Sequence, residues 1–250
     1  YCGRSIVVRG DHTLSVSGGT FWTHGESLIV EQGKSRVRVA GSELKSNGAP
    51  CVAVRGGDHT IVLPILRAMA KKHGPVGLIH IDAHTDISDT MFGAKIAHGT
   101  PFRRAVEEGL LDCSRVVQIG MRGTGYTAED FDWSRQQGFR VVQAEECWHK
   151  SLTPLMAEVR EQVGDGPVYI SFDIDGLDPS FAPGTGTPEV GGLTMPQALE
   201  IVRGCRGLNV VGCDLVEVAP IYDTSGLTSL TGANLLYEIL CVMPGVVYRD

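Results

Sequence analysis

Short apolar runs alternate with stretches of helical periodicity along residues 51–250. Apolar runs of roughly four to eight residues between turn residues are typical of buried parallel strands, and apolar residues recurring every three or four positions are typical of helices. The pattern predicts strands at 52–54, 75–81, 115–119, 139–143, 167–172 and 208–216, and helices at 61–72, 100–111, 128–137, 152–163, 194–203 and 229–242.

Strands that alternate with helices at roughly 30-residue intervals build a mainly parallel sheet covered by helices on both faces. We therefore expect one α/β domain over residues 51–250, with three layers in the order α/β/α. Residues 1–50 have a different texture, with strand-like alternation at 5–8 and 35–40 between glycine-rich turns. We treat them as a separate N-terminal segment of uncertain structure.

Composition narrows the class of protein. The 250-residue chain has no run of 18 apolar residues, so we expect no membrane span. A net charge of -7 and a pI near 5.6 argue against a nucleic-acid partner. The seven cysteines are odd in number, widely spaced and without a CxxC pair, so we expect free thiols in a reducing, intracellular compartment.

Acidic and imidazole side chains gather where the predicted strands end. Asp82, His84 and Asp86 follow one strand at every second position, and Asp173 and Asp175 repeat that spacing after another. In an extended backbone, residues two apart point to the same side. Each group is therefore expected to converge on a small volume.

His59 and Glu217 follow two further predicted strands, and the carboxyl ends of parallel strands meet at one edge of a sheet. So many crowded carboxylates are unfavourable unless a cation neutralises them. The absence of thiolates excludes a structural zinc site and favours a harder ion such as manganese. Four aspartates, about -4 in charge, balance two divalent ions, and ions about 3.5–4 Å apart can activate one shared water.

Three nearby polar residues are expected to have structural roles. Asp58 and Asp178 lie in turn sequences and are expected to stabilise their loops. His80 is interpreted as lying out of phase with Asp82 and His84 along the strand, and therefore outside the cluster.

Five segments in sequence order resemble the ureohydrolase family, which comprises arginases, agmatinases and guanidino-acid hydrolases. The similarity is strongest to its agmatinase branch and to animal mitochondrial agmatinase-like proteins, and it extends from residue 51 to about residue 243. The segments are Gly56-Gly57-Asp58-His59, Ile81-Asp82-Ala83-His84-Thr85-Asp86, Ser171 to Pro179, Ala182 to Glu189, and Glu217-Val218-Ala219-Pro220.

The resemblance implies an arginase-like fold and two Mn²⁺ ions with shared ligands. It implies one ion held by His59, Asp82, Asp86 and Asp173, and a second held by Asp82, His84, Asp173 and Asp175.

The resemblance also implies hydrolysis of a guanidino compound to urea and an amine. Glu217 is then expected to bind the substrate guanidinium, and Asp86 to pass a proton to the leaving amine. His98 is expected to contact substrate and shuttle protons. It further implies a homo-oligomer, as a trimer or hexamer, and a location in the mitochondrial matrix, with the cytoplasm as alternative.

Two segments differ from the arginase pattern. Residues 92–97 lack the Ser and Asn that arginase carries before the histidine matched by His98, so we do not expect an α-amino acid substrate. Residues 1–50 do not resemble the start of the family. A chain with a divergent segment there could also be a catalytically silent member that binds a metal or a partner.

Two substrates stay open, agmatine, which yields putrescine, and a linear guanidino acid such as 4-guanidinobutyrate. Agmatine, our first expectation, has a cationic tail, and the acids have an anionic one. Acidic residues at the pocket rim would favour agmatine, and arginines would favour an acid. The candidates are Glu129, Asp130 and Asp132, against Arg122 and Arg135.

Overall fold

The computed structural model describes residues 6–9, 13–23, 28–31, 36–46, 52–55, 57–123 and 128–246, with side chains described in 57–123 and 131–246. These residues divide into two compact units, one of residues 1–57 with 245–250 and one of residues 58–244. In the first unit, parallel strands follow the order β1-β3-β5 and a separate parallel pair joins β2 to β4. Their bounds are β1 Ile6–Arg9, β2 Thr13–Thr23, β3 Leu28–Glu31, β4 Arg36–Ser46 and β5 Val52–Arg55.

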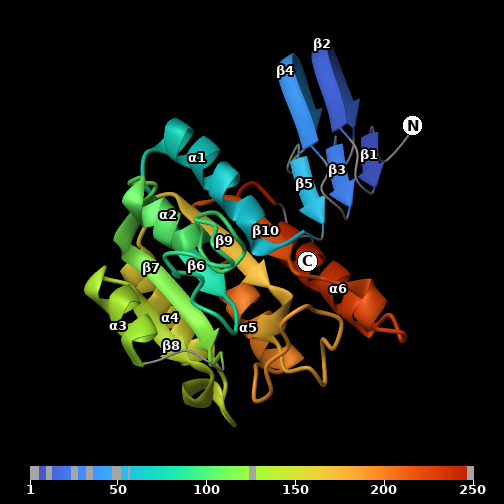
Figure 1. Ribbon diagram of the computed structural model, residues 1–250. Coiled ribbons are helices and arrows are strands. Elements are labelled where there is room, and N and C mark those ends of the chain that lie inside the picture. Colours follow the sequence, from blue (N-terminus) through green and yellow to red (C-terminus); the bar gives the residue numbers. More distant parts are fainter. Residues whose placement is uncertain are drawn as a thin grey trace. The chain divides into compact units, whose positions relative to one another are not determined.

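The second unit contains a five-stranded sheet in the order β10-β9-β6-β7-β8, with every pair parallel (Figure 1). The most buried strands, β6 and β9, lie inside this order, as their unbroken apolar runs predict. The strands are β6 Val76–Ile81, β7 Leu111–Met121, β8 Arg140–Gln143, β9 Val168–Asp173 and β10 Val210–Val216.

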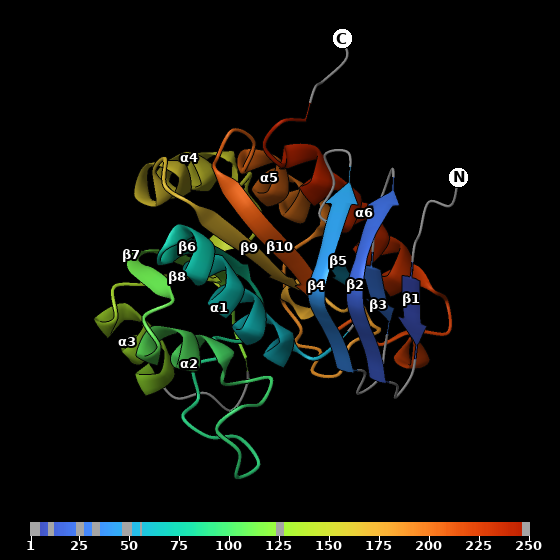
Figure 2. The same ribbon diagram turned by 90° about the horizontal axis from the view of Figure 1, so that it is seen from above.

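Helices cover both faces of this sheet (Figure 2). On one face lie α1 Val62–His73, α2 Pro101–Glu107 and α3 Ala128–Gln136, and on the other lie α4 Thr153–Val163, α5 Met195–Gly204 and α6 Leu227–Val242. Short 3-10 turns occur at His59–Ile61, Ala144–Cys147, Ile174–Gly176 and Pro220–Tyr222. The three-layer α/β/α architecture with a parallel sheet is therefore confirmed.

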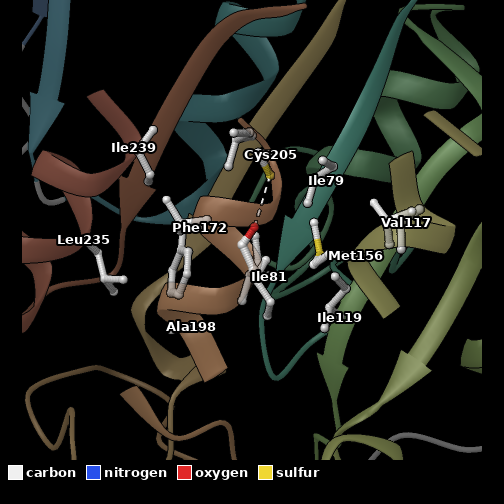
Figure 3. Packing of buried hydrophobic residues seen from close by; sticks show 14 of the residues in the cluster. Ile79, Ile81, Val117, Ile119, Met156, Phe172, Ala198, Cys205, Leu235 and Ile239 are labelled. Atoms are coloured by element: carbon white, nitrogen blue, oxygen red, sulfur yellow. Dashed lines mark hydrogen bonds between the residues drawn. The ribbon is translucent and has the colours of Figure 1, made fainter. Parts of the chain in front are cut away.

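Each face of the sheet has its own apolar core, because successive strand residues point to opposite faces. Ile79 and Ile81 pack with Met156 of α4 and Ala198 of α5, as Figure 3 shows. Leu78, the residue before Ile79, points to the opposite face of the sheet and packs with residues of α1 and α2. The two cores fix the strand register and thereby the direction in which each strand end presents its polar residues.

The predicted helix at 100–111 is too long. It ends at Glu107, and Leu111 already begins β7. Gly109 adopts φ 67°, and Leu110 N donates back to Ala105 O, which is the usual glycine-terminated helix end. Leu110 and Leu111 continue the helical periodicity, but the left-handed glycine stops the helix before them.

Among the cysteines whose side chains are described, Cys113, Cys147, Cys205 and Cys213 are free thiols, as the sequence predicts. Within the described part of the chain, no helix has the length and apolar character needed to cross a membrane.

Candidate metal centre

Two strand ends, with the residues that follow them, and two 3-10 turns, His59–Ile61 and Ile174–Gly176, position the predicted ligands. Asp82 follows β6 directly, Asp173 ends β9, and His59 begins the turn His59–Ile61. Asp58 caps that turn, since its carboxylate accepts a hydrogen bond from Thr60 N at 3.0 Å, so its predicted loop role is confirmed. The ligand side chains are buried except for His84, which is partly exposed.

The first group of predicted ligands surrounds His59. Its Nδ1 atom lies 2.9 Å from Asp86 Oδ2, 3.1 Å from Asp82 Oδ2 and 3.3 Å from Asp173 Oδ2. Three carboxylates from two strand ends thus converge on one ring nitrogen. These four residues are the ones that the family resemblance assigns to the first ion.

The second group surrounds His84. Its Nδ1 atom lies 3.1 Å from Asp175 Oδ2 and 3.4 Å from Asp82 Oδ1. Asp82 therefore turns one carboxylate oxygen to each imidazole, as a bridging ligand must. Asp173 directs Oδ2 to the first group, and its Oδ1 accepts a hydrogen bond from Asp175 N at 2.9 Å.

This arrangement fits divalent cations. His59 Nδ1 is buried and makes no hydrogen bond of acceptable geometry to another described residue, although three carboxylate oxygens face it. Asp82, His84 and Asp175 likewise form a group that could hold an ion. Carboxylates with imidazoles and no thiolate are the donors that manganese accepts.

The pKa values show how much negative charge is concentrated here. Burial, together with Asp175 and Asp82, raises the pKa of Asp173 well above its ordinary value. Burial and the neighbouring Asp82 raise the pKa of Asp86 to about 6. Burial lowers the pKa of His84, but hydrogen bonds with Asp175 and Asp82 outweigh it and raise that pKa to about 11. Bound cations would remove the need for these protons.

Two residues of the site have left-handed backbone. Asp86 has φ 53° and Glu217 has φ 63°, conformations that cost a residue other than glycine roughly 1–2 kcal/mol. Such strain persists where the surrounding structure holds it, often at functional sites. Glu217 Oε1 also accepts a hydrogen bond from His59 N at 2.6 Å, and burial raises the pKa of Glu217 to about 7. Glu217 therefore lies beside the first ligand group.

The profile of the Arginase family matches residues 6–242. The chain belongs to the arginase family. It is 78% identical over 194 residues to the guanidinobutyrase of Pseudomonas aeruginosa, covering 78% of this chain and 61% of that protein. It is 68% identical to the mitochondrial agmatinase of Gallus gallus and 64% identical to the mitochondrial guanidino acid hydrolase of Homo sapiens. Each of these two matches covers 84% of this chain, and 62% and 60% of the relative, respectively.

A solved structure of proclavaminate amidino hydrolase from Streptomyces clavuligerus has a TM-score of 0.73 and 36% identity, with 81% of this chain and 74% of that chain covered. This arginase-family chain spans about three fifths of the length of the curated relatives it matches. The family profile begins at residue 6, inside the segment set apart by the sequence, so the boundary at residue 50 stays a prediction.

The arginines expected to signal an anionic substrate tail have other contacts in this arginase-family chain. Arg122 donates hydrogen bonds to backbone carbonyls, among them Asp175 O at 2.8 Å. Arg135 pairs with Asp132 at 3.4 Å. The side chains of Glu129 and Asp130 lie outside the described residues. Neither substrate tail is therefore favoured by this part of the structure.

His98 belongs to the loop between β6 and α2, where its ring lies 6.0 Å from that of Phe92. The loop returns to the site through Gly99, whose carbonyl accepts a hydrogen bond from Ser88 N at 3.0 Å. The role of His98 as proton shuttle stays a prediction. Asp178, in contrast, bonds Ser180 N and Gly191 N, which confirms its expected loop role.

The interpretation that His80 lies out of phase with Asp82 is wrong. His80 and Asp82 are two residues apart and therefore share a face of the strand, and His80 Nε2 lies 2.8 Å from Asp82 Oδ2. Sequence reasoning also missed Gln118, Ser171 and Asp214, which surround the ligands from neighbouring strands. The sequence signal that could have identified these three residues is a polar or charged side chain within an otherwise apolar strand.

Proposed function

We propose that this chain is the catalytic part of a two-manganese amidinohydrolase, which cleaves a linear guanidino compound to urea and an amine. The observation that carries the proposal is the pair of ligand groups around His59 and His84, joined by the two oxygens of Asp82. A purely structural ion pair would not require five buried groups of this kind. The names of the relatives, which include a guanidinobutyrase and an agmatinase, support the same chemistry.

Two manganese ions held by these residues would supply a water that is nucleophilic near neutral pH. Glu217 would receive the substrate guanidinium, because a half-buried carboxylate beside the site forms a strong charge-assisted pair with that cation. Asp86, whose pKa is raised to about 6, is suited to hold a proton and pass it to the leaving amine. His98 would carry protons between this site and solvent.

For the substrate tail we place 4-guanidinobutyrate ahead of agmatine. The support is the 78% identity to a guanidinobutyrase and the 64% identity to a guanidino acid hydrolase. Agmatine is the second candidate, on the 68% identity to an agmatinase. Urea release from the manganese-loaded chain, measured with both compounds and with arginine, separates them. No urea from any of the three would favour a silent, metal-binding or partner-binding protein.

The metal ligands are tested by Asp173→Asn, which keeps the size of the side chain and removes its charge. We expect loss of turnover and a lower manganese content, measured as urea release and as bound metal per chain. Asp112→Asn makes the same chemical change at a half-exposed position remote from the ligands and should leave both unchanged. Full activity of Asp173→Asn with two ions still bound would contradict the assignment.

We also propose that the protein acts as a homo-oligomer, trimer or hexamer, in the mitochondrial matrix, with the cytoplasm as the alternative. The location is supported by the mitochondrial relatives from Gallus gallus and Homo sapiens. Light scattering in solution tests the assembly, and a monomer at micromolar concentration would contradict it.

A further inference from the structure

A row of buried polar side chains crosses the sheet directly behind the ligands. Asp214 of β10 pairs in register with Ser171 of β9, Ser171 with His80 of β6, and His80 with Gln118 of β7. All four are at most 3% exposed. We call Asp214, Ser171, His80 and Gln118 the polar row. Ser171 and His80 precede ligands by two residues, so the row and those ligands share one face of the sheet.

The Gln118 end of the row fixes the protonation of His80. Gln118 Nε2 donates a hydrogen bond to Thr85 O at 2.8 Å. Because a carbonyl oxygen can only accept, this contact identifies the amide nitrogen and orients the side chain. The second proton of that nitrogen then points to His80 Nδ1 at 3.0 Å. His80 Nδ1 is therefore the acceptor, and Nε2 carries the proton that is donated to Asp82 Oδ2.

The Asp214 end of the row fixes His59. Asp214 accepts one hydrogen bond from Tyr169 OH and one from Ser171 Oγ, both at 2.8 Å. The single proton of the serine hydroxyl is thus directed to Asp214. Ser171 Oγ must then accept the proton of His59 Nε2, which lies 2.8 Å away. With Nε2 engaged as a donor, Nδ1 is the only nitrogen of His59 that can give a lone pair to an ion.

We propose that the polar row decides which of two neighbouring imidazoles binds metal. The rings of His59 and His80 lie 5.2 Å apart, and both belong, with Asp82, to a group that could hold an ion. The row presents a lone pair from His59 and an N–H from His80. His59 is therefore a ligand, and His80 is a positioning residue that holds the bridging carboxylate of Asp82. This inference rests on the metal site proposed above and extends it to the residues behind the ligands.

A contribution to folding stability does not by itself explain the polar row. Gln118 Oε1 is buried without a hydrogen-bond partner among the described residues, which is unfavourable in an apolar layer. Apolar residues of similar volume often replace buried polar groups without loss of stability. Positioning of ligands explains the polar side chains, since partners behind metal-binding groups typically change metal affinity 10–100-fold.

One test measures the protonation of His80 without a mutation. A two-bond ¹H–¹⁵N spectrum of the metal-free chain, labelled with ¹⁵N at histidine, shows which ring nitrogen carries the proton. The His80 signals are identified as those missing in His80→Gln. We expect the proton on Nε2 in the wild-type chain and a mixture of both tautomers in Gln118→Leu. A proton on Nδ1 in the wild-type chain would overturn the proposal.

A second test measures Mn²⁺ affinity from the electron paramagnetic resonance signal of the free ion. We expect His80→Leu and Ser171→Ala to bind Mn²⁺ about 10–100-fold more weakly than the wild-type chain. His80→Gln should recover much of the loss, because its amide can still donate to Asp82. Ser134→Ala is the control, since Ser134 is equally buried and its hydroxyl has no hydrogen-bond partner among the described residues.

The outcomes separate this inference from the proposed function. Wild-type affinity in a folded His80→Leu would overturn the positioning role, as would a loss of thermal stability without a loss of affinity. A wild-type chain that binds no Mn²⁺ would overturn the proposed function and, with it, the ligand role of His59. If His80→Leu fails to fold, the tautomer measured in the wild-type chain and Gln118→Leu still decides.

Discussion

Arg122 joins the two loops that flank the second ligand group, and its removal should loosen both. Its Nη2 donates to Asp175 O at 2.8 Å and to Leu177 O at 3.1 Å, and also to Glu189 O at 2.6 Å. One side chain therefore connects the turn that carries Asp175 with the loop segment that contains Glu189. Burial lowers the pKa of Arg122, and nearby carboxylates, Asp175 foremost, oppose that effect.

The magnitude follows from the acceptors that Arg122→Met would leave behind. Asp175 and Leu177 accept from Nη2, Gly120 and Gly176 accept from Nη1, and all four residues are buried; each buried acceptor without its donor costs about 1–3 kcal/mol. Four such carbonyls give about 4–12 kcal/mol, and we expect a smaller loss of about 3 kcal/mol because water can reach a side chain that is partly exposed. At about 2–4 °C per kcal/mol for a chain of this size, Tm should fall by about 6–12 °C.

Thermal unfolding followed by circular dichroism measures this change, with and without Mn²⁺. Arg135→Met is the matched control, since Arg135 is exposed and pairs only weakly with Asp132 at 3.4 Å. We expect that variant to stay close to the wild-type Tm. A fall of less than about 2 °C in Arg122→Met would refute the view that this guanidinium holds the two loops together.

Three further predictions concern the site and its support. Glu217→Gln keeps an acceptor for His59 N but loses the charge that receives the guanidinium. Urea release should therefore fall by about 100-fold or more, while Mn²⁺ affinity is retained. A loss of Mn²⁺ affinity would contradict the role assigned to Glu217. Gly120→Ala should lower the free energy of unfolding by at least about 1 kcal/mol more than Gly109→Ala. Both glycines have positive φ, but a Cβ at Gly120 would lie 2.9 Å from a backbone carbonyl oxygen, whereas a Cβ at Gly109 would face open space. Equal denaturation midpoints for the two variants would argue against that clash. Finally, the pKa of His84 in the metal-free chain is raised to about 11, so the folded chain binds more protons than the unfolded chain above pH 6.5 or so. The stability that His84 contributes should therefore fall as pH rises from about 6.5 towards 11, and it should fall less when Mn²⁺ is present. An increase in the Tm of the metal-free chain from pH 6.5 to 9 would contradict this prediction.

Much of the fold and of the candidate metal site could be predicted from local sequence. The helices and strands of residues 58–244 lie close to the predicted segments, because their periodicity is a local property. Two lengths were wrong in the same region: the helix predicted at 100–111 ended early, before Gly109, and the strand predicted at 115–119 extends over Leu111–Met121. Asp82, His84 and Asp86 also meet at one site, as their spacing predicts, but the extended backbone assumed for them is wrong, because β6 ends at Ile81 and Asp86 is left-handed.

The partners behind those ligands were decided only by the tertiary structure. Ser171 and Asp214 are 43 residues apart, and His80 and Gln118 are 38 residues apart, yet each pair bonds across adjacent strands. Which strands become neighbours depends on crossover connections and on the packing of two separate cores, and neither is written in a local pattern. The sequence by itself determined which side chains stand at the strand ends. The order and register of the strands determined which nitrogen, oxygen or hydroxyl each of them faces.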